Sequence, residues 1–136
     1  MNAAPAFQAG QAGSLPGLLG FEWIEAHEGL VRGRVTVAHH HLAPTGYLHA
    51  ATIVALADTA CGFGCLGTLP RGAAGFTTAE LKANFIGTVR AGAITCDAQL
   101  VHGGRTTQVW DATVKDESTG KTIALFRCTQ IVLYPA

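Results

Sequence analysis

One ionisable side chain, Asp58, stands inside the most apolar segment of the chain. This segment runs from residue 50 to residue 66 and reads A-A-T-I-V-A-L-A-D-T-A-C-G-F-G-C-L. Its length and composition predict one long helix, from about His49 to Leu66. Because a helix that is apolar on every side must be covered all round, the rest of the chain has to wrap it. A partner subunit would cover whatever the chain leaves open.

A carboxylate in such a segment needs an explanation, since burying it costs roughly several kcal/mol unless it is paired or changes its protonation state. One reading is a reactive acid or base. The alternative is a structural acid that caps a neighbouring loop or pairs with a buried base. The segment is about long enough to cross a bilayer. Its acid, its glycines and the absence of basic flanks favour a core helix instead.

The composition favours a single cytoplasmic domain that associates with itself. A length of 136 residues is typical of one domain, and 49% hydrophobic against 13% charged residues indicates that part of the surface is hidden in an oligomer. The formal net charge of +0 gives no reason to expect a nucleic-acid or membrane partner. No secretory signal is visible at the start, and the 4 cysteines form no C-x-x-C pair, so we expect reduced, buried thiols in a cytoplasmic protein.

The remaining pattern predicts one α+β domain over residues 14–136, preceded by a flexible tail over residues 1–13. Alternating polar and apolar residues, bounded by glycine and proline, indicate strands. Strands joined by short turns must be antiparallel, so a curved antiparallel sheet would wrap the helix. In chain order we expect a short helix at 15–19, strands at 21–26 and 30–38, the long helix, and strands at about 78–85, 93–101, 105–115 and 121–133.

His49 and Asp58 are nine residues apart on the predicted helix. Nine steps of about 100° place them on opposite sides of the helix, and a rise of roughly 1.5 Å per residue separates them by about 13 Å. The two side chains therefore cannot meet on one substrate atom within one chain. They could meet across a two-fold axis, which would make the active unit at least a dimer with two shared sites.

The start of the helix supplies a third element. Its first N–H groups have no intrahelical partner and carry partial positive charge, and that of Ala50 is one of them. Such a group can hold the oxygen of a thioester or ester carbonyl as negative charge develops. With the partner's Asp58 activating water, or attacking the carbonyl itself, these parts suit acyl-transfer hydrolysis.

Three stretches resemble the hotdog-fold acyl-CoA thioesterases, and within them the phenylacetate-pathway (PaaI-like) branch. The first, P-T-G-Y-L-H-A-A-T-I-V-A-L-A-D-T-A, is similar to the family's helix-entry motif. The second, T-T-A-E-L-K-A-N-F-I-G-T-V-R-A-G, resembles its third strand, and V-H-G-G-R-T-T-Q-V-W-D-A-T-V resembles a later strand pair. The resemblance covers about residues 14–133. It implies a sheet wrapped around the long helix, homodimers and usually homotetramers, and cofactor-free hydrolysis of acyl-CoA.

Residue by residue, the resemblance also implies which groups form the site. His49 matches the motif histidine, Ala50 the oxyanion-hole position and Asp58 the catalytic carboxylate. No metal ion is implied. The nearest basic and hydroxyl groups that would hold the CoA phosphates are Arg90, Arg105, Thr106 and Thr107.

The sequence departs from the family pattern at two places. The usual Asn or Gln six residues before the histidine is Ala43 here, and one of the three consecutive histidines at residues 39–41 could supply the missing polar group. The usual Gly-Gly after the histidine is Ala50-Ala51. This change keeps the backbone N–H but brings a methyl group close to the thioester.

Other chemistries remain open. The same fold could carry a hydratase or dehydratase with His49 and Asp58 as acid and base. It could also be a non-catalytic acyl-CoA binding module, which Ala43 and Ala50-Ala51 favour. Consecutive histidines in a loop rarely converge on one metal ion. Cys61 and Cys65 lie four apart on one helix face without an evident base. We therefore expect them to pack rather than to act as nucleophiles.

Overall fold

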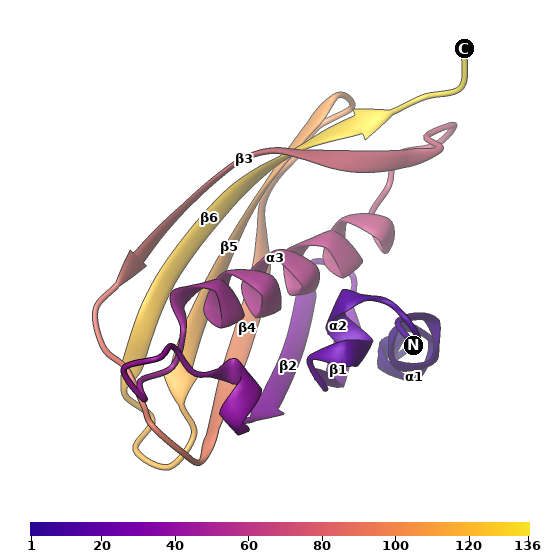
Figure 1. Cartoon of the computed structure of the whole chain (residues 1–136). Coiled ribbons are helices and arrows are strands. Elements are labelled where there is room, and N and C mark those ends of the chain that lie inside the picture. The colour runs from indigo at the N-terminus through magenta and orange to yellow at the C-terminus, as the bar shows by residue number, and fades with distance from the viewer.

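A six-stranded antiparallel sheet curves around one long helix, α3 (Ala50–Leu66), in the computed structural model, which describes residues 1–136 (Figure 1). The other elements, in chain order, are α1 (Ala4–Gly10), α2 (Leu15–Leu18), β1 (Glu22–His27), β2 (Leu30–Thr36), the 3-10 turn η1 (His39–His41), β3 (Gly75–Phe85), β4 (Ala93–Gly103), β5 (Thr107–Asp116) and β6 (Thr122–Leu133). The strand order across the sheet is β1-β2-β4-β5-β6-β3. The predicted α+β class, with an antiparallel sheet wrapped around one helix, is confirmed.

The strands run close to their predicted positions, with one difference that matters for the site. β5 begins at Thr107, so Arg105 and Thr106, which were predicted to lie on this strand, belong to the turn between β4 and β5. The backbone N–H of Gly104 donates to the carbonyl of Thr107 at 2.9 Å and closes this turn. The guanidinium of Arg105 is therefore carried by a hairpin tip rather than by a strand face.

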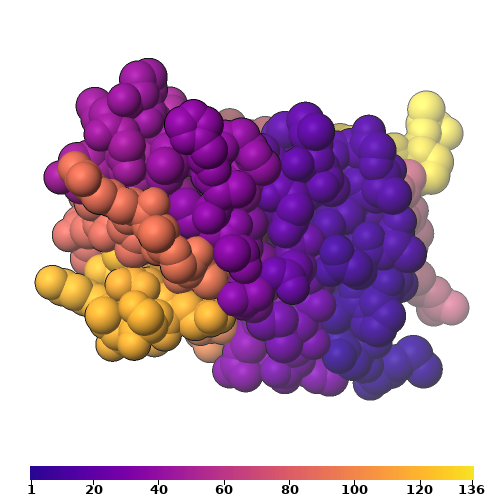
Figure 2. Space-filling view, turned by 60° about the horizontal axis from the view of Figure 1, so that its bottom comes forward, coloured from indigo at the N-terminus to yellow at the C-terminus, as the bar shows by residue number.

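The N-terminal segment is helical and packed, so the prediction of a flexible tail over residues 1–13 is wrong. Phe7 of α1 stacks on Phe63 of α3, with ring centroids 4.4 Å apart. Gln11 is buried and accepts a hydrogen bond from the indole N–H of Trp23 at 2.7 Å. Figure 2 shows this indigo segment lying against the purple loop and helix that follow β2. The contacts join residues far apart in the sequence, so the local Ala, Gly and Gln pattern gives no sign of them.

Trp110 of β5 is fully buried against α3, and one glycine makes room for it. A Cβ atom on Gly64 would lie under 3.0 Å from three ring carbons of Trp110. Replacing Gly64 by alanine should therefore lower the free energy of unfolding by about 1–3 kcal/mol, the usual effect of overpacking, as measured by urea denaturation. In a Gly10→Ala control a Cβ meets nothing within 4 Å, so stability should hardly change. Equal losses in the two variants would contradict the packing argument.

One side of α3 is not covered by the sheet. Ala51 and Leu66 are exposed there, and Asp58 is only half-buried. β3 ends the strand order and has one unpaired edge, and its Leu81, which lies opposite the buried Cys128, faces inward yet is 41% exposed. We call the exposed face of α3, together with the inner face of β3, the open side. None of the helices is long and apolar enough to cross a membrane.

Candidate active site

His49 caps the start of α3. Its backbone is extended, with φ −71° and ψ 134°, and its ring Nδ1 accepts a hydrogen bond from the N–H of Ala51 at 2.9 Å. Because Nδ1 is an acceptor here, a neutral His49 carries its proton on Nε2, which is the nitrogen free to meet a substrate. The predicted helix start is correct, and His49 belongs to the cap rather than to the first turn.

The backbone N–H of Ala50 is the free donor at this helix end. The next two N–H groups are occupied, since Ala51 donates to the ring of His49 and Thr52 donates to the His49 carbonyl at 3.0 Å. Ala50 is exposed and has no acceptor within the chain. The partial positive charge of a 17-residue helix is concentrated at this end. A carbonyl oxygen brought to Ala50 would therefore meet an unused donor.

His41 fixes the loop that leads into the helix. Its ring is 2% exposed and both ring nitrogens are used, because Nδ1 accepts from the Ala38 N–H at 2.9 Å and Nε2 donates to the Leu19 carbonyl at 2.7 Å. Its own carbonyl accepts from the N–H of His49 at 3.0 Å and from the Thr52 hydroxyl at 2.9 Å. His41 is thus committed to structure, and nowhere do three or more His, Cys, Asp or Glu side chains gather to hold a metal ion.

Asp58 lies on the open side, next to an apolar cavity of about 160 Å³. It forms no ion pair, and its one hydrogen bond is a long contact of 3.4 Å from the Thr78 hydroxyl. Thr78 makes a shorter contact, 2.7 Å, with Oε1 of Gln130. Burial raises the pKa of Asp58 above its ordinary value, and the bond from Thr78 offsets this in part. The other residues that line the cavity are Thr59, Gly62, Phe63, Leu66 and Phe76.

His49 and Asp58 do not come together within one chain. His49 lines a different cavity, of about 320 Å³, together with His40, Leu42 and the α2 residue Leu15. No residue lines both this cavity and the one beside Asp58. The separation agrees with the nine-residue spacing on the helix, which places the two groups on different sides.

The two predicted phosphate-binding arginines lie at opposite ends of α3. The guanidinium of Arg90 stands 4.2 Å over the ring of Tyr47, in the loop that enters the helix. Arg105 lies in the β4–β5 turn, close to the other end, where Gln108 donates to the carbonyl of Thr68 at 3.0 Å just beyond α3. Neither arginine is in an ion pair with an acidic side chain. Thr106 lies in the same turn as Arg105 and Thr107 begins β5, so both are far from the start of α3.

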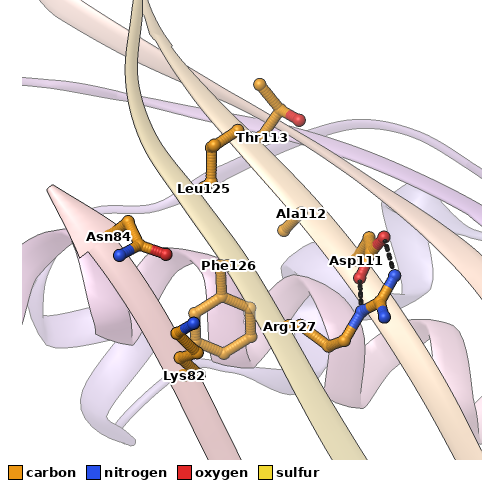
Figure 3. A pocket seen from close by; sticks show the side chains of 8 residues that line it. All are labelled: Lys82, Asn84, Asp111, Ala112, Thr113, Leu125, Phe126 and Arg127. Atoms are coloured by element: carbon orange, nitrogen blue, oxygen red, sulfur yellow. Dashed lines mark hydrogen bonds and ion pairs between the residues drawn. The ribbon is translucent and has the colours of Figure 1, made fainter. Parts of the chain in front are cut away.

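The largest cavity, of about 350 Å³, lies elsewhere, on the outer face of the sheet (Figure 3). Besides Lys82, its charged side chains pair with each other, since Arg127 donates to both carboxylate oxygens of Asp111, at 2.5 Å and 2.8 Å. The cavity beside Asp58 is smaller, but it holds an acid without a cationic partner. Chemistry rather than size therefore identifies the candidate site.

The cysteines serve packing, as predicted from their spacing. All four are buried. Burial raises the pKa of the Cys65 thiol to about 11, and a hydrogen bond with Cys128, together with burial, raises the pKa of the Cys61 thiol. A thiol that stays protonated at neutral pH is a poor nucleophile.

Known proteins share both the sequence and the fold of this chain. Residues 45–123 match the family model of the Thioesterase superfamily. The chain is 32% identical to 1,4-dihydroxy-2-naphthoyl-CoA hydrolase of Listeria monocytogenes, over 82% of this chain and 89% of that protein. Its fold matches that of a mutant of thioesterase PA1618 from Pseudomonas aeruginosa, with a TM-score of 0.90 and 27% identity over 96% of this chain and 93% of that one.

A further match is the E. coli PaaI protein from the phenylacetic acid degradation operon, with a TM-score of 0.83 and 27% identity over 94% of this chain and 90% of that one. The resemblance carried by the helix-entry motif is thereby confirmed for fold and family. The chain belongs to the thioesterase superfamily and is a hotdog-fold thioester hydrolase with a PaaI-like structure.

Proposed function

We propose that the protein hydrolyses the thioester of a small or aromatic acyl-CoA to the free acid and CoA, at a site shared by two protomers. The observation that carries this proposal is the half-buried Asp58, which has no cationic partner and lies beside an apolar cavity. The free N–H of Ala50 is the complementary hydrogen-bond donor for the thioester carbonyl oxygen. The Listeria relative, whose name is that of an acyl-CoA hydrolase, supports the substrate class.

The chemistry needs one water and no cofactor. The Ala50 N–H donates to the thioester carbonyl oxygen and stabilises the negative charge that develops there. The partner's Asp58 takes a proton from water, and the hydroxide attacks the carbonyl carbon. The tetrahedral intermediate collapses, the C–S bond breaks, and the proton passes from Asp58 to the departing CoA thiolate. In the alternative route Asp58 attacks the carbonyl itself, and water then hydrolyses the resulting anhydride.

The open side leaves room for a second protomer, which supports the proposal of a shared site. On this side of α3 the side chain of Ala51 is exposed and that of Ala55 is half-buried, and both are small, so a second copy of the helix can approach closely. Two antiparallel helices whose first halves overlap bring the start of one to the middle of the other. In that arrangement the Ala50 of one protomer meets the partner's Asp58. The unpaired edge of β3 adds backbone groups that a second β3 would satisfy.

The same arrangement gives the arginines and one histidine a role. Arg90 lies near the helix start of its own protomer, and the partner's Arg105 lies beyond the partner's Asp58, so both would flank the path of the CoA phosphates, with Thr106 and Thr107 beside Arg105. The polar group missing at Ala43 would come from His40. Among the three consecutive histidines it is His40 that lines the cavity of His49.

The test is release of free thiol from a panel of short, branched and aromatic acyl-CoAs. Thiol release from at least one of them by the wild-type protein is the expected result. Loss of enoyl absorbance without thiol release would instead favour a hydratase. Tight binding of the whole panel without turnover would favour a binding module.

The acid limb of the pH–rate profile should lie higher than for an ordinary aspartate. Since the base must be ionised and burial raises the pKa of Asp58, kcat/KM should fall with decreasing pH at a midpoint above about 3.9. Thr78→Val loses the hydrogen bond that favours the charged form, so its midpoint should move further up. A midpoint at or below the ordinary value would contradict Asp58 as the base.

A further inference from the structure

Phe63 of α3 separates two cavities. On one side it lines the cavity of about 160 Å³ beside Asp58. On the other side it lines a second cavity, of about 130 Å³, whose lining combines apolar residues such as Ala3, Phe7 and Val31 with the polar His27 and Glu28. A single aromatic ring thus stands between the candidate reaction site and a second, partly apolar cavity beside helix α1.

The ring of Phe63 is held in place from two directions. Phe7 stacks on it with ring centroids 4.4 Å apart and ring planes only 4° from parallel. Trp23 meets it edge-on at 5.1 Å and 89°. Trp23 is itself fixed, because its indole N–H donates to Gln11 and its backbone N–H donates to Oε1 of Gln8 at 2.7 Å. Contacts of both geometries are favourable for aromatic rings, so Phe63 cannot swing aside at little cost.

We propose that Phe63 is the specificity-determining residue that limits the length of the acyl group, and that helix α1 holds this residue in place through Phe7. The proposal rests on the proposed function in one respect only, namely that the acyl group enters the cavity beside Asp58. An apolar cavity of about 150 Å³ is large enough to hold benzene. The cavity beside Asp58 therefore fits one aromatic ring or a short acyl chain. A longer chain would collide with Phe63 before reaching the second cavity.

Substitutions at Phe63 test the proposal in both directions. Phe63→Ala joins the two cavities and should raise the ratio of kcat/KM for octanoyl-CoA to that for butyryl-CoA by about tenfold or more, the scale of a few methylene groups gaining a pocket. Phe63→Trp should lower the same ratio and reduce the use of benzoyl-CoA. Phe7→Ala keeps Phe63 but removes the ring that stacks on it, so this variant should raise the ratio by a smaller factor. Phe63→Leu is the milder variant if Phe63→Ala does not fold.

Phe76→Ala is the matched control. It removes the same ring from the cavity beside Asp58, but Phe76 does not border the second cavity. The ratio should therefore change less than in Phe63→Ala. An unchanged ratio in Phe63→Ala, or an equal shift in Phe76→Ala, would overturn the proposal.

A binding measurement separates this proposal from the proposed function. S-butyl-CoA and S-octyl-CoA are thioethers that cannot be hydrolysed, and calorimetry gives their affinities for Asp58→Asn with and without Phe63→Ala. A gain in affinity for the octyl but not the butyl compound supports Phe63 as the residue that limits acyl length. This holds even if the wild-type protein releases no thiol from any acyl-CoA. The same relative affinities in both proteins overturn it, even if the wild-type protein is an active thioesterase.

Discussion

Replacing Asp58 by asparagine is expected to reduce kcat by about a hundredfold or more, the scale of losing a general base. The amide has nearly the shape of the carboxylate and can still accept the hydrogen bond from Thr78. It cannot take a proton from water or attack a carbonyl. The measurement is thiol release at saturating acyl-CoA. Thr59→Val, which alters the same cavity but keeps the acid, should retain most of the activity, whereas equal rates for wild type and Asp58→Asn would remove Asp58 from the mechanism.

The same variant also distinguishes a reactive acid from a structural one. Burial raises the pKa of Asp58 in the folded state, so its contribution to stability is present at low pH and is lost as the pH rises through that value. Asparagine never ionises. Asp58→Asn should therefore be more stable than the wild type at neutral pH and equally stable in acid, as measured by urea denaturation at the two pH values. A structural acid would show the reverse, namely a loss of stability at neutral pH with kcat retained.

The elements that follow from local pattern are the ones that sequence reasoning finds. The long helix at Ala50–Leu66 and the alternating strands, such as β2 at Leu30–Thr36, carry their periodicity in consecutive residues. Helix α1 carries none. Its order depends on Phe7 reaching Phe63 and on Gln11 reaching Trp23, contacts that the chain creates only after it has folded.

The residues of the candidate site also fall into two groups, those that the sequence reveals and those that only the fold reveals. Asp58 and His49 are visible in the sequence because an acid in an apolar segment and a histidine at a helix start are local signals. Thr78 is 20 residues from its partner Asp58, and His41 acts through the carbonyl of Leu19, so only the fold reveals their roles. Phe63 reads as one more apolar residue of the helix until the two cavities on either side of it are known.

Replacing Ala50 by proline is expected to lower kcat by about a hundredfold to a thousandfold, the scale of losing one oxyanion-hole donor. Proline removes the backbone N–H and places the Cδ of its ring on that nitrogen. Ala50 is the first residue of α3, where proline is well tolerated, and the extended backbone of His49 at φ −71° and ψ 134° is what a residue before proline prefers. Ala50→Gly keeps the N–H and should keep the activity. Circular dichroism of Ala50→Pro with wild-type helix content, together with undiminished thiol release, would contradict the oxyanion role.

Mixing the two inactive variants tests whether the site is shared. In a dimer of Asp58→Asn with Ala50→Pro, one site carries both defects, while the other combines an intact Ala50 N–H with the partner's intact Asp58. Random pairing after joint refolding makes about half of the dimers mixed, so about a quarter of the wild-type activity should return. If the Ala50 N–H and the Asp58 carboxylate of one chain served the same substrate, every site in the mixture would keep one defect. The mixture would then be no more active than the two variants measured separately.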